Sequence, residues 1–225
     1  MHLTKDVGGT VLKTQSGPGS SAAEIGASAS GDGGPLIVGI GGTLRPGSST
    51  ERAVTATLLA AASAGARILM LGAAELQLPL YSPGDTERTA AARRLVDSVS
   101  RADGLVIGTP AYHGGMSGLV KNALDYIEDL REDRRPYLHG RAVGCLVTAQ
   151  GTQGASALAG LRSVVHALRG WPTPLGVTVN TEETVLRPDG TSADARMAAQ
   201  LAIVGEQVVE FARMQPPTRM RAAAR

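Results

Sequence analysis

The residues best suited to chemistry form a short loop between an apolar segment and a helical pattern. The apolar segment covers 36–40, the loop covers 42–50, and apolar residues recur at helical spacing over 51–62. The first backbone N–H groups of a helix lack partners within the helix and carry partial positive charge. A phosphate placed there can accept several hydrogen bonds. The loop adds hydroxyl donors and one guanidinium, which come from Thr43, Arg45, Ser48, Ser49 and Thr50.

Two better-known phosphate loops do not match these residues. A loop for nucleoside triphosphates reads G-x-x-x-x-G-K-[ST], but Ser48 stands where the lysine should be. A dinucleotide fingerprint reads G-x-G-x-x-G, and Leu44 occupies the place of its third glycine. The loop therefore suits a single phosphomonoester dianion better than a triphosphate or a pyrophosphate.

The composition indicates one aliphatic domain with short tails. The chain has 225 residues, of which 43% are apolar and only 3% aromatic, and its formal net charge is +2. So small a charge argues against nucleic acid or a membrane as a partner. The single cysteine, Cys145, lies in an apolar run and is expected to be a buried structural thiol. With no apolar run of signal-peptide or membrane-spanning length, we expect a cytoplasmic protein.

Three parts of the chain differ in composition. Residues 1–34 are rich in Gly, Ser, Ala and Thr, so we expect a flexible N-terminal extension. Residues 35–213 contain the apolar runs and are expected to form the domain. Residues 214–225 carry arginines without acids, and we expect a disordered basic tail.

Within the domain, short apolar runs alternate with helical patterns. The runs cover 36–40, 67–71, 104–109, 142–148 and 175–179. Continuous apolar strands separated by amphipathic helices are typical of a parallel sheet covered on both faces. We therefore predict an α/β protein with the flavodoxin-like fold, a doubly wound five-stranded parallel sheet. The segment 76–85, with two prolines and a glycine, interrupts the alternation and is predicted to be irregular.

Two further loops follow predicted strands and are rich in small or polar residues. In this fold the loops after the first, third and fourth strands converge on one crevice. The backbone after 104–109 can approach a flat ligand closely, and Tyr112 can cover part of it. This loop contains Pro110, Ala111, Tyr112, His113, Gly114 and Gly115. The loop after the fourth strand contains Thr148, Gln150 and Gly151.

These loops resemble those of the NADPH-dependent FMN reductases, a family that includes the flavin reductases of two-component monooxygenases and related azo- and quinone reductases. The family's G-S-x-R-x-x-S-x-N corresponds here to Gly42, Thr43, Arg45, Ser48 and Thr50. Its T-P-E-Y-N-G-S-x-P-G-x-L-K-N-A-x-D-W is matched at Thr109, Pro110, Tyr112, Gly114, Gly118, Lys121, Asn122, Ala123 and Asp125. The departures are Ala111 for Glu, His113 for Asn, Ser117 for Pro and Tyr126 for Trp. The family's L-P-L-Y stands at Leu78, Pro79, Leu80 and Tyr81.

The resemblance implies FMN as the cofactor and NAD(P)H as the hydride donor. The FMN phosphate would lie on the loop 42–50, and the ring would lie against 110–115 with Tyr112 beside it. Residues of the third loop would complete the site. Because the cofactor carries the chemistry, no catalytic acid or base is expected. No grouping of His, Asp and Glu has metal-ligand spacing, so no metal is expected either.

The resemblance also implies a homodimer or homotetramer in which helices like 117–130 pack between subunits. The leading hypothesis for function is an NAD(P)H-dependent FMN reductase, whose electrons go to free flavin or a small acceptor and whose partner is a flavin-dependent monooxygenase. Two alternatives remain open at this point: an FMN-dependent quinone or azo reductase, and a flavodoxin-type electron carrier or redox sensor without nicotinamide chemistry.

Overall fold

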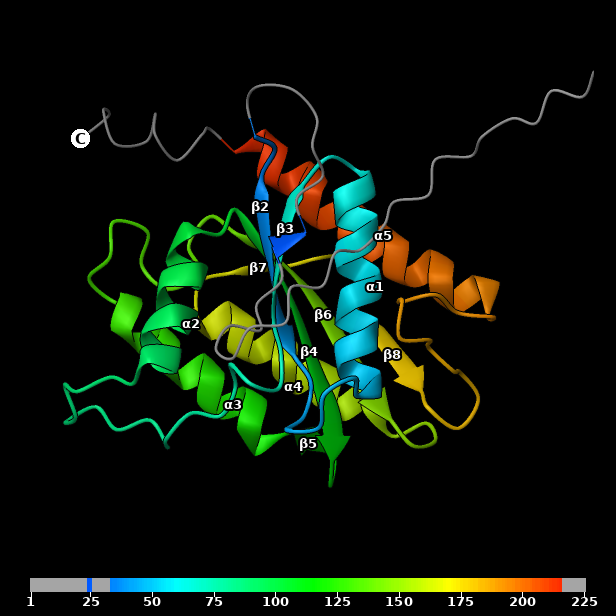
Figure 1. Ribbon diagram of the computed structural model, residues 1–225, viewed down its shortest axis with the longest axis horizontal. Coiled ribbons are helices and arrows are strands. Elements are labelled where there is room, and N and C mark those ends of the chain that lie inside the picture. Colours follow the sequence, from blue (N-terminus) through cyan, green and yellow to red (C-terminus); the bar gives the residue numbers. More distant parts are fainter. Residues whose placement is uncertain (1–23, 26–32, 216–225) are drawn as a thin grey trace, which may run out of the picture.

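A computed structural model describes residues 24–25 and 33–215 of the chain (Figure 1). The expected flexible extension and basic tail lie outside these residues, apart from 24–25, 33–34 and 214–215. The strands are β1 Glu24–Ile25, β2 Leu36–Gly41, β3 Arg67–Leu71, β4 Gly104–Tyr112, β5 Gly115–Met116, β6 Ala142–Ala149, β7 Trp171–Pro172 and β8 Val177–Asn180. The helices are α1 Ser49–Ser63, α2 Ala90–Arg101, α3 Gly118–Asp125, the 3₁₀ helix η1 Tyr126–Leu130, α4 Gly154–Ala167 and α5 Ala195–Met214.

The strands form a mostly parallel sheet with the order of the flavodoxin-like fold. The path runs β1-β3-β2-β4-β6-β7, and β8 also pairs with β6. In the five-stranded parallel core, the chain moves outward from β2 to β3 and then returns to β4 on the other side of β2. The strand order therefore reverses between β2 and β4, and ligands of this fold bind at the carboxyl ends of such strands. The predicted fold class is confirmed.

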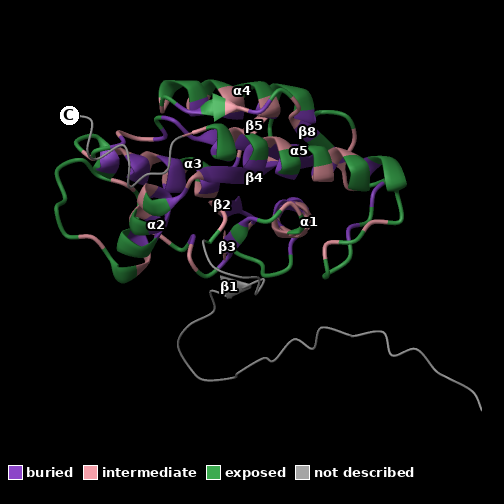
Figure 2. Ribbon diagram, turned by 90° about the horizontal axis from the view of Figure 1, so that it is seen from above, coloured by how far each residue is buried: buried purple, intermediate pink, exposed green. Residues whose placement is uncertain are grey.

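Helices cover both faces of the sheet, because alternate residues of each strand point to opposite sides. Val38, Leu105 and Ile107 pack in one core with residues of α2, α3 and α4. Ile37 and Val106 pack in a second core with residues of α1 and α5. Figure 2 shows α2 and α3 on one side of the sheet and α1 on the other. This double coverage explains why the central strands read as continuous apolar runs.

The fifth core strand is shorter than predicted and is divided in two. β7 pairs with the first residues of β6, whereas β8 pairs with its last four. Between them, Pro174 has no N–H group to donate, and the N–H of Leu175 donates to Gln207 Oε1 on α5 at 3.2 Å. The expected strand over 175–179 therefore begins only at Val177.

At the amino end of the sheet, a fully buried arginine closes the end of α2. Arg141 donates to the carbonyl oxygens of Ala102, Tyr137 and Ser100 at 2.9, 2.9 and 2.7 Å. The last carbonyls of a helix lack partners within the helix and carry partial negative charge. Arg141, which directly precedes β6, donates to two carbonyls at this helix end although it lies about forty residues further along the chain.

Candidate functional site

A cavity of about 590 Å³ opens where β2, β4, β6 and β8 end. Its size lies within the range of small-molecule and cofactor sites. Twelve of the fourteen predicted site residues line it: Thr43, Arg45, Ser48, Ser49, Thr50, Pro110, Ala111, Tyr112, His113, Gly114, Thr148 and Gln150. The structure therefore brings all three predicted loops to one cavity, whereas Gly115 and Gly151 are not among the lining residues.

Three lining residues were not predicted: Ala149, Gln153 and Thr181. Ala149 ends β6, Gln153 precedes α4, and Thr181 directly follows β8. The sequence could have indicated Thr181, because the end of the fifth parallel strand lies at the same edge of the sheet as the ends of the three strands that precede the predicted loops. Gln153 belongs to the third loop but lies beyond the residues of that loop that were predicted.

The loop 42–50 turns the chain from β2 into α1 and leaves the helix start facing the cavity. Ser48 caps α1, since its Oγ accepts a hydrogen bond from the N–H of Glu51 at 3.3 Å. Gly42 and Gly47 adopt φ angles of 122° and 66°, a backbone conformation that favours glycine. The Ser48 hydroxyl, although nearly inaccessible to solvent, still has a proton to donate toward an anion.

A buried pair of hydroxyls joins the start of α1 to the end of β6. Thr50 Oγ1 and Thr148 Oγ1 lie 2.5 Å apart, although the two residues are 98 positions apart in the sequence. One hydroxyl donates to the other, so the pair keeps one O–H group that can donate to a ligand. This contact places the first and third loops side by side.

Arg45 lies on the exposed part of the same loop. Its N–H donates to Thr43 Oγ1 at 3.1 Å, and the Thr43 hydroxyl lies 3.3 Å from the Arg45 carbonyl oxygen. The Thr43 side chain therefore fixes the backbone of the loop. Within residues 24–25 and 33–215, the guanidinium of Arg45 has no hydrogen bond or ion pair, which leaves its donors available to a ligand.

The second loop is a tight β-hairpin, and β4 extends three residues beyond its predicted end. Ala111 pairs with Met116 and Tyr112 with Gly115, so only His113 and Gly114 form the turn. Both have positive φ, 49° and 80°, as a type I′ turn requires. Asn-Gly is the favoured pair for this turn, and His113 stands where the motif of the FMN reductases has Asn. The turn is fastened to α4 because Ser156 Oγ donates to the Gly114 carbonyl oxygen at 2.9 Å.

Asn122, a residue of the second motif, holds the irregular segment that contains the L-P-L-Y match. The N–H of Tyr81 donates to Asn122 Oδ1 at 2.8 Å, and Asn122 Nδ2 donates to the Pro79 carbonyl oxygen at 2.8 Å. The Tyr126 hydroxyl donates to the same oxygen at 3.1 Å. These hydrogen bonds therefore join the second motif to the L-P-L-Y segment, although the two are separate in sequence. The predicted helix over 117–130 is divided into α3 and η1 at Tyr126.

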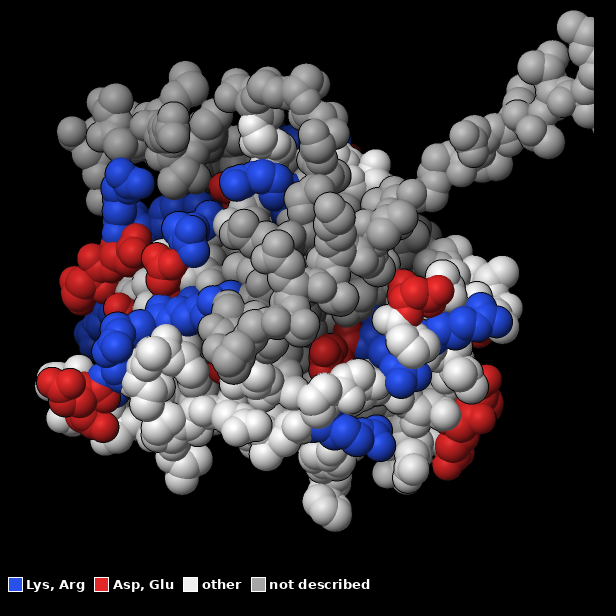
Figure 3. Space-filling view, viewed as in Figure 1, with Lys and Arg blue, Asp and Glu red and all other residues white. Residues whose placement is uncertain are grey.

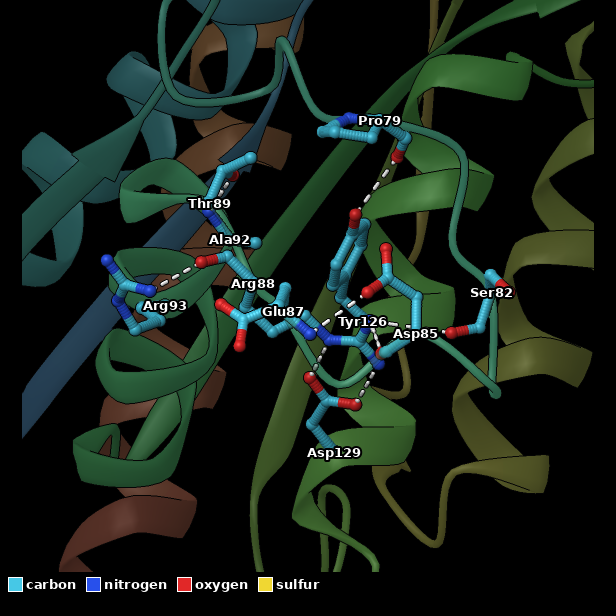
Figure 4. Close-up of polar contacts among 10 residues, drawn as sticks. All are labelled: Pro79, Ser82, Asp85, Glu87, Arg88, Thr89, Ala92, Arg93, Tyr126 and Asp129. Atoms are coloured by element: carbon cyan, nitrogen blue, oxygen red, sulfur yellow. Dashed lines mark hydrogen bonds and ion pairs between the residues drawn. The ribbon is translucent and has the colours of Figure 1, made fainter.

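Figure 4 shows how Arg88 fastens the far end of this segment. Its guanidinium makes two hydrogen bonds to the Asp129 carboxylate, at 2.8 and 2.9 Å, and lies 5.0 Å from the Tyr81 ring centroid. The bond to Asp129 raises the pKa of Arg88 above its usual value. Between these anchors, the Leu80 side chain is 87% exposed.

Among the ionisable groups near the cavity, Glu51 has a shifted pKa. Burial raises the pKa of its carboxyl above the usual value, and the charge of Glu75 acts in the same direction. The N–H of Gly47, which donates to Glu51 Oε2 at 3.1 Å, and the cation of Arg52 oppose this rise. The Glu51 carboxylate therefore lies beside the loop 42–50, whose hydroxyl, N–H and guanidinium donors favour an anion.

The described part of the chain offers neither a cluster of three or more metal-ligating side chains nor a helix long and apolar enough to cross a membrane. On the face shown in Figure 3, basic and acidic side chains of the described residues are interspersed.

The fold and cavity define a flavodoxin-like protein whose helix α1 begins at the strand switch point, facing the cavity. The family model of NADPH-dependent FMN reductases matches residues 35–184. The chain belongs to this family, as the resemblance of its loops predicted.

Two relatives agree with this assignment. The FMN-dependent NADPH-azoreductase of Staphylococcus haemolyticus (strain JCSC1435) is 31% identical over 122 residues, which cover 53% of this chain and 62% of that protein. That of Staphylococcus aureus (strain USA300) is 29% identical over 126 residues, which cover 54% of this chain and 63% of that protein. The matches therefore span less than two thirds of these relatives.

Two solved structures share the fold. FerB, a flavoenzyme NAD(P)H:(acceptor) oxidoreductase from Paracoccus denitrificans, is 20% identical with a TM-score of 0.64, and the match covers 80% of this chain and 98% of that one. The apo form of an NADH:FMN oxidoreductase is 24% identical with a TM-score of 0.62, and the match covers 83% of this chain and 94% of that one.

Proposed function

We propose that the protein is an NAD(P)H-dependent FMN reductase whose flavin site is the cavity at the ends of β2, β4 and β6. The observation that carries the proposal is the meeting of two features in one cavity. A hydroxyl-rich helix start with the available guanidinium of Arg45 faces the same space as the hairpin at His113 and Gly114. The donors on one side fit a phosphate, and the extended backbone on the other fits the face of a flat ring.

The residues of the chain bind and orient the cofactor in this proposal. Ser48, Ser49 and the first N–H groups of α1 donate to the phosphate, and Arg45 adds charge-assisted hydrogen bonds. Pro110, Ala111 and the turn support the ring. FMN, when bound, would supply the redox chemistry between NAD(P)H and an acceptor. None of the carboxylates among the described residues lines the cavity, and the proposal assigns no acid or base to the chain.

FMN binding and nicotinamide oxidation test the proposal. The purified full chain is titrated with FMN by flavin fluorescence, and oxidation of NADH and NADPH is then followed at 340 nm with FMN, FAD, riboflavin and a quinone as acceptors. We expect micromolar or tighter FMN binding and oxidation of at least one nicotinamide. Binding of FMN without nicotinamide oxidation would point instead to an electron carrier or sensor. Failure to bind FMN at micromolar levels would end the proposal.

An azoreductase is the second candidate, because the Staphylococcus relatives are FMN-dependent NADPH-azoreductases. Adding an azo dye to the same assay separates the two. If FMN stays bound and the dye is reduced faster than free flavin, the protein is an azoreductase. If turnover follows the concentration of added FMN, the protein is a flavin-shuttling reductase, and a flavin-dependent monooxygenase is its expected partner.

We further propose that the protein works in the cytoplasm as a homodimer or homotetramer. Leu80 supports the assembly. It is 87% exposed, while Asn122, Tyr126 and Arg88 hold the segment around it. An apolar side chain held out in this way is suited to a second subunit. Light scattering tests the assembly, and Leu80→Glu is expected to shift it toward monomers. A monomer at micromolar concentration in the unsubstituted protein would refute it.

A further inference from the structure

A carboxylate lies unusually close to the proposed phosphate site. Glu51 Oε2 accepts the N–H of Gly47 at 3.1 Å, so this donor of the loop is already used. Glu51 Oε2 and Ser48 Oγ lie 3.6 and 3.4 Å from a single point, the place where a Cβ on Gly42 would stand. The two oxygens are therefore at most about 7 Å apart. Glu51 does not line the cavity, but its carboxylate lies within about 7 Å of the hydroxyl that would donate to a phosphate.

The surroundings of Glu51 do not neutralise this charge fully. Arg52, its neighbour on α1, directs Nη1 to the Leu186 carbonyl oxygen at 2.9 Å. Glu75 approaches from the segment after β3, where its Oε2 accepts the N–H of Gly72 at 3.1 Å. A Cβ on Gly72 would stand 3.3 Å from Glu51 Oε1, so two carboxylates flank this part of the chain. Burial and the charge of Glu75 raise the pKa of the Glu51 carboxyl, and a phosphate nearby would add a further negative charge to this part of the chain.

We propose that Glu51 lowers the affinity of the site at the start of α1 for the phosphate of FMN. This inference rests on the proposed function, because it takes the phosphate of FMN to bind at the start of α1. The affinity for phosphate is lowered for two reasons. The Glu51 carboxylate repels a dianion, and it already uses the N–H of Gly47 as a donor. At separations of several ångströms in solvent of physiological salt, the repulsion corresponds to about three- to tenfold in a dissociation constant.

Two substitutions test the inference. Glu51→Gln removes the charge and keeps an oxygen that can accept the N–H of Gly47. Glu51→Ala removes the charge and also releases that N–H. The matched control is Glu206→Gln on α5, because Glu206 lies near Ala64, just past the opposite end of α1. Binding of FMN and of riboflavin, which lacks the phosphate, is measured by flavin fluorescence at low and at 0.5 M salt.

We expect Glu51→Gln and Glu51→Ala to tighten FMN binding about three- to tenfold at low salt and less at high salt. Binding of riboflavin should not change, and the Glu206→Gln control should match the unsubstituted protein. If the unsubstituted protein binds FMN but both Glu51 variants bind it with the same affinity, the inference is wrong and the proposed function stands. Equal tightening for riboflavin would also overturn it, since the effect would not act through the phosphate. If the unsubstituted protein binds no FMN, both proposals fail.

Discussion

Removing Arg45 gives the sharpest test of where the FMN phosphate binds. The side chain lies on the exposed part of the loop 42–50 and lines the cavity, and its guanidinium has no partner among the described residues. Arg45→Ala therefore removes ligand contacts and leaves no buried group unpaired in the free protein. A hydrogen bond to a charged group contributes about 1.5–3 kcal/mol. Because the side chain is exposed and its charge is screened by solvent, we expect a loss near 1.5 kcal/mol, which is about tenfold in the dissociation constant.

The assay compares ligands with and without the phosphate. FMN and riboflavin are titrated into the unsubstituted protein, Arg45→Ala and Arg45→Lys. The expected loss appears for FMN and not for riboflavin, and Arg45→Lys restores part of it because a charge remains without the planar fork. Far-ultraviolet circular dichroism serves as the control for folding.

Two results would refute the reasoning. An unchanged FMN dissociation constant in Arg45→Ala would remove Arg45 from the phosphate site. An equal loss for FMN and riboflavin would show that Arg45 contacts the ring or shapes the loop. Because both Arg45 and Glu51 are proposed to act through the phosphate, the two substitutions should change FMN affinity in opposite directions.

Three further predictions concern other parts of the molecule. Ser156→Ala removes the hydrogen bond that holds the hairpin turn at Gly114, so FMN and riboflavin should both bind about two- to tenfold more weakly, the range of one ordinary hydrogen bond. A loss of affinity for FMN alone would contradict the placement of the ring. Arg141→Met leaves the carbonyl oxygens of Ser100 and Tyr137 without their donor and takes one of two donors from that of Ala102, so it should lower the free energy of unfolding by about 3 kcal/mol, measured by urea denaturation. A change below about 1 kcal/mol would contradict this prediction. Burial raises the pKa of Cys145 to about 12, so a thiol reagent at pH 8 should modify it only after unfolding, and rapid modification of the native protein would show that the thiol is accessible.

Much of the fold could be predicted because its signals are local. The strand β2, the loop 42–50 and the helix α1 follow one another in the sequence, and each has its own pattern of apolar, small or helical residues. The parallel sheet followed from runs that are apolar on both faces. The prediction of a strand over 175–179 failed at its start because the pairing of Leu175 with Gln207 on α5 is not visible in a strand pattern.

The convergence of the three loops on one crevice was predictable from the fold class, but the contacts within the site were not. The positive φ of His113, which turns the second loop into a hairpin, depends on the pairing of β4 with β5. Gln153 and Thr181 line the cavity because of where α4 and β8 lie. The role of Asn122 also needed the structure, since its partners lie more than forty residues earlier in the chain.

The sequence by itself determined the elements of this protein and the family to which it belongs. Short patterns suffice for this, because capping, turn formation and strand or helix preference act between residues close in the chain. The tertiary structure alone decided which distant groups meet: the hydroxyl of Thr50 with that of Thr148, and the hydroxyl of Ser156 with the carbonyl of Gly114. Such contacts depend on how the strands order themselves and how the helices pack, and no local pattern carries that information.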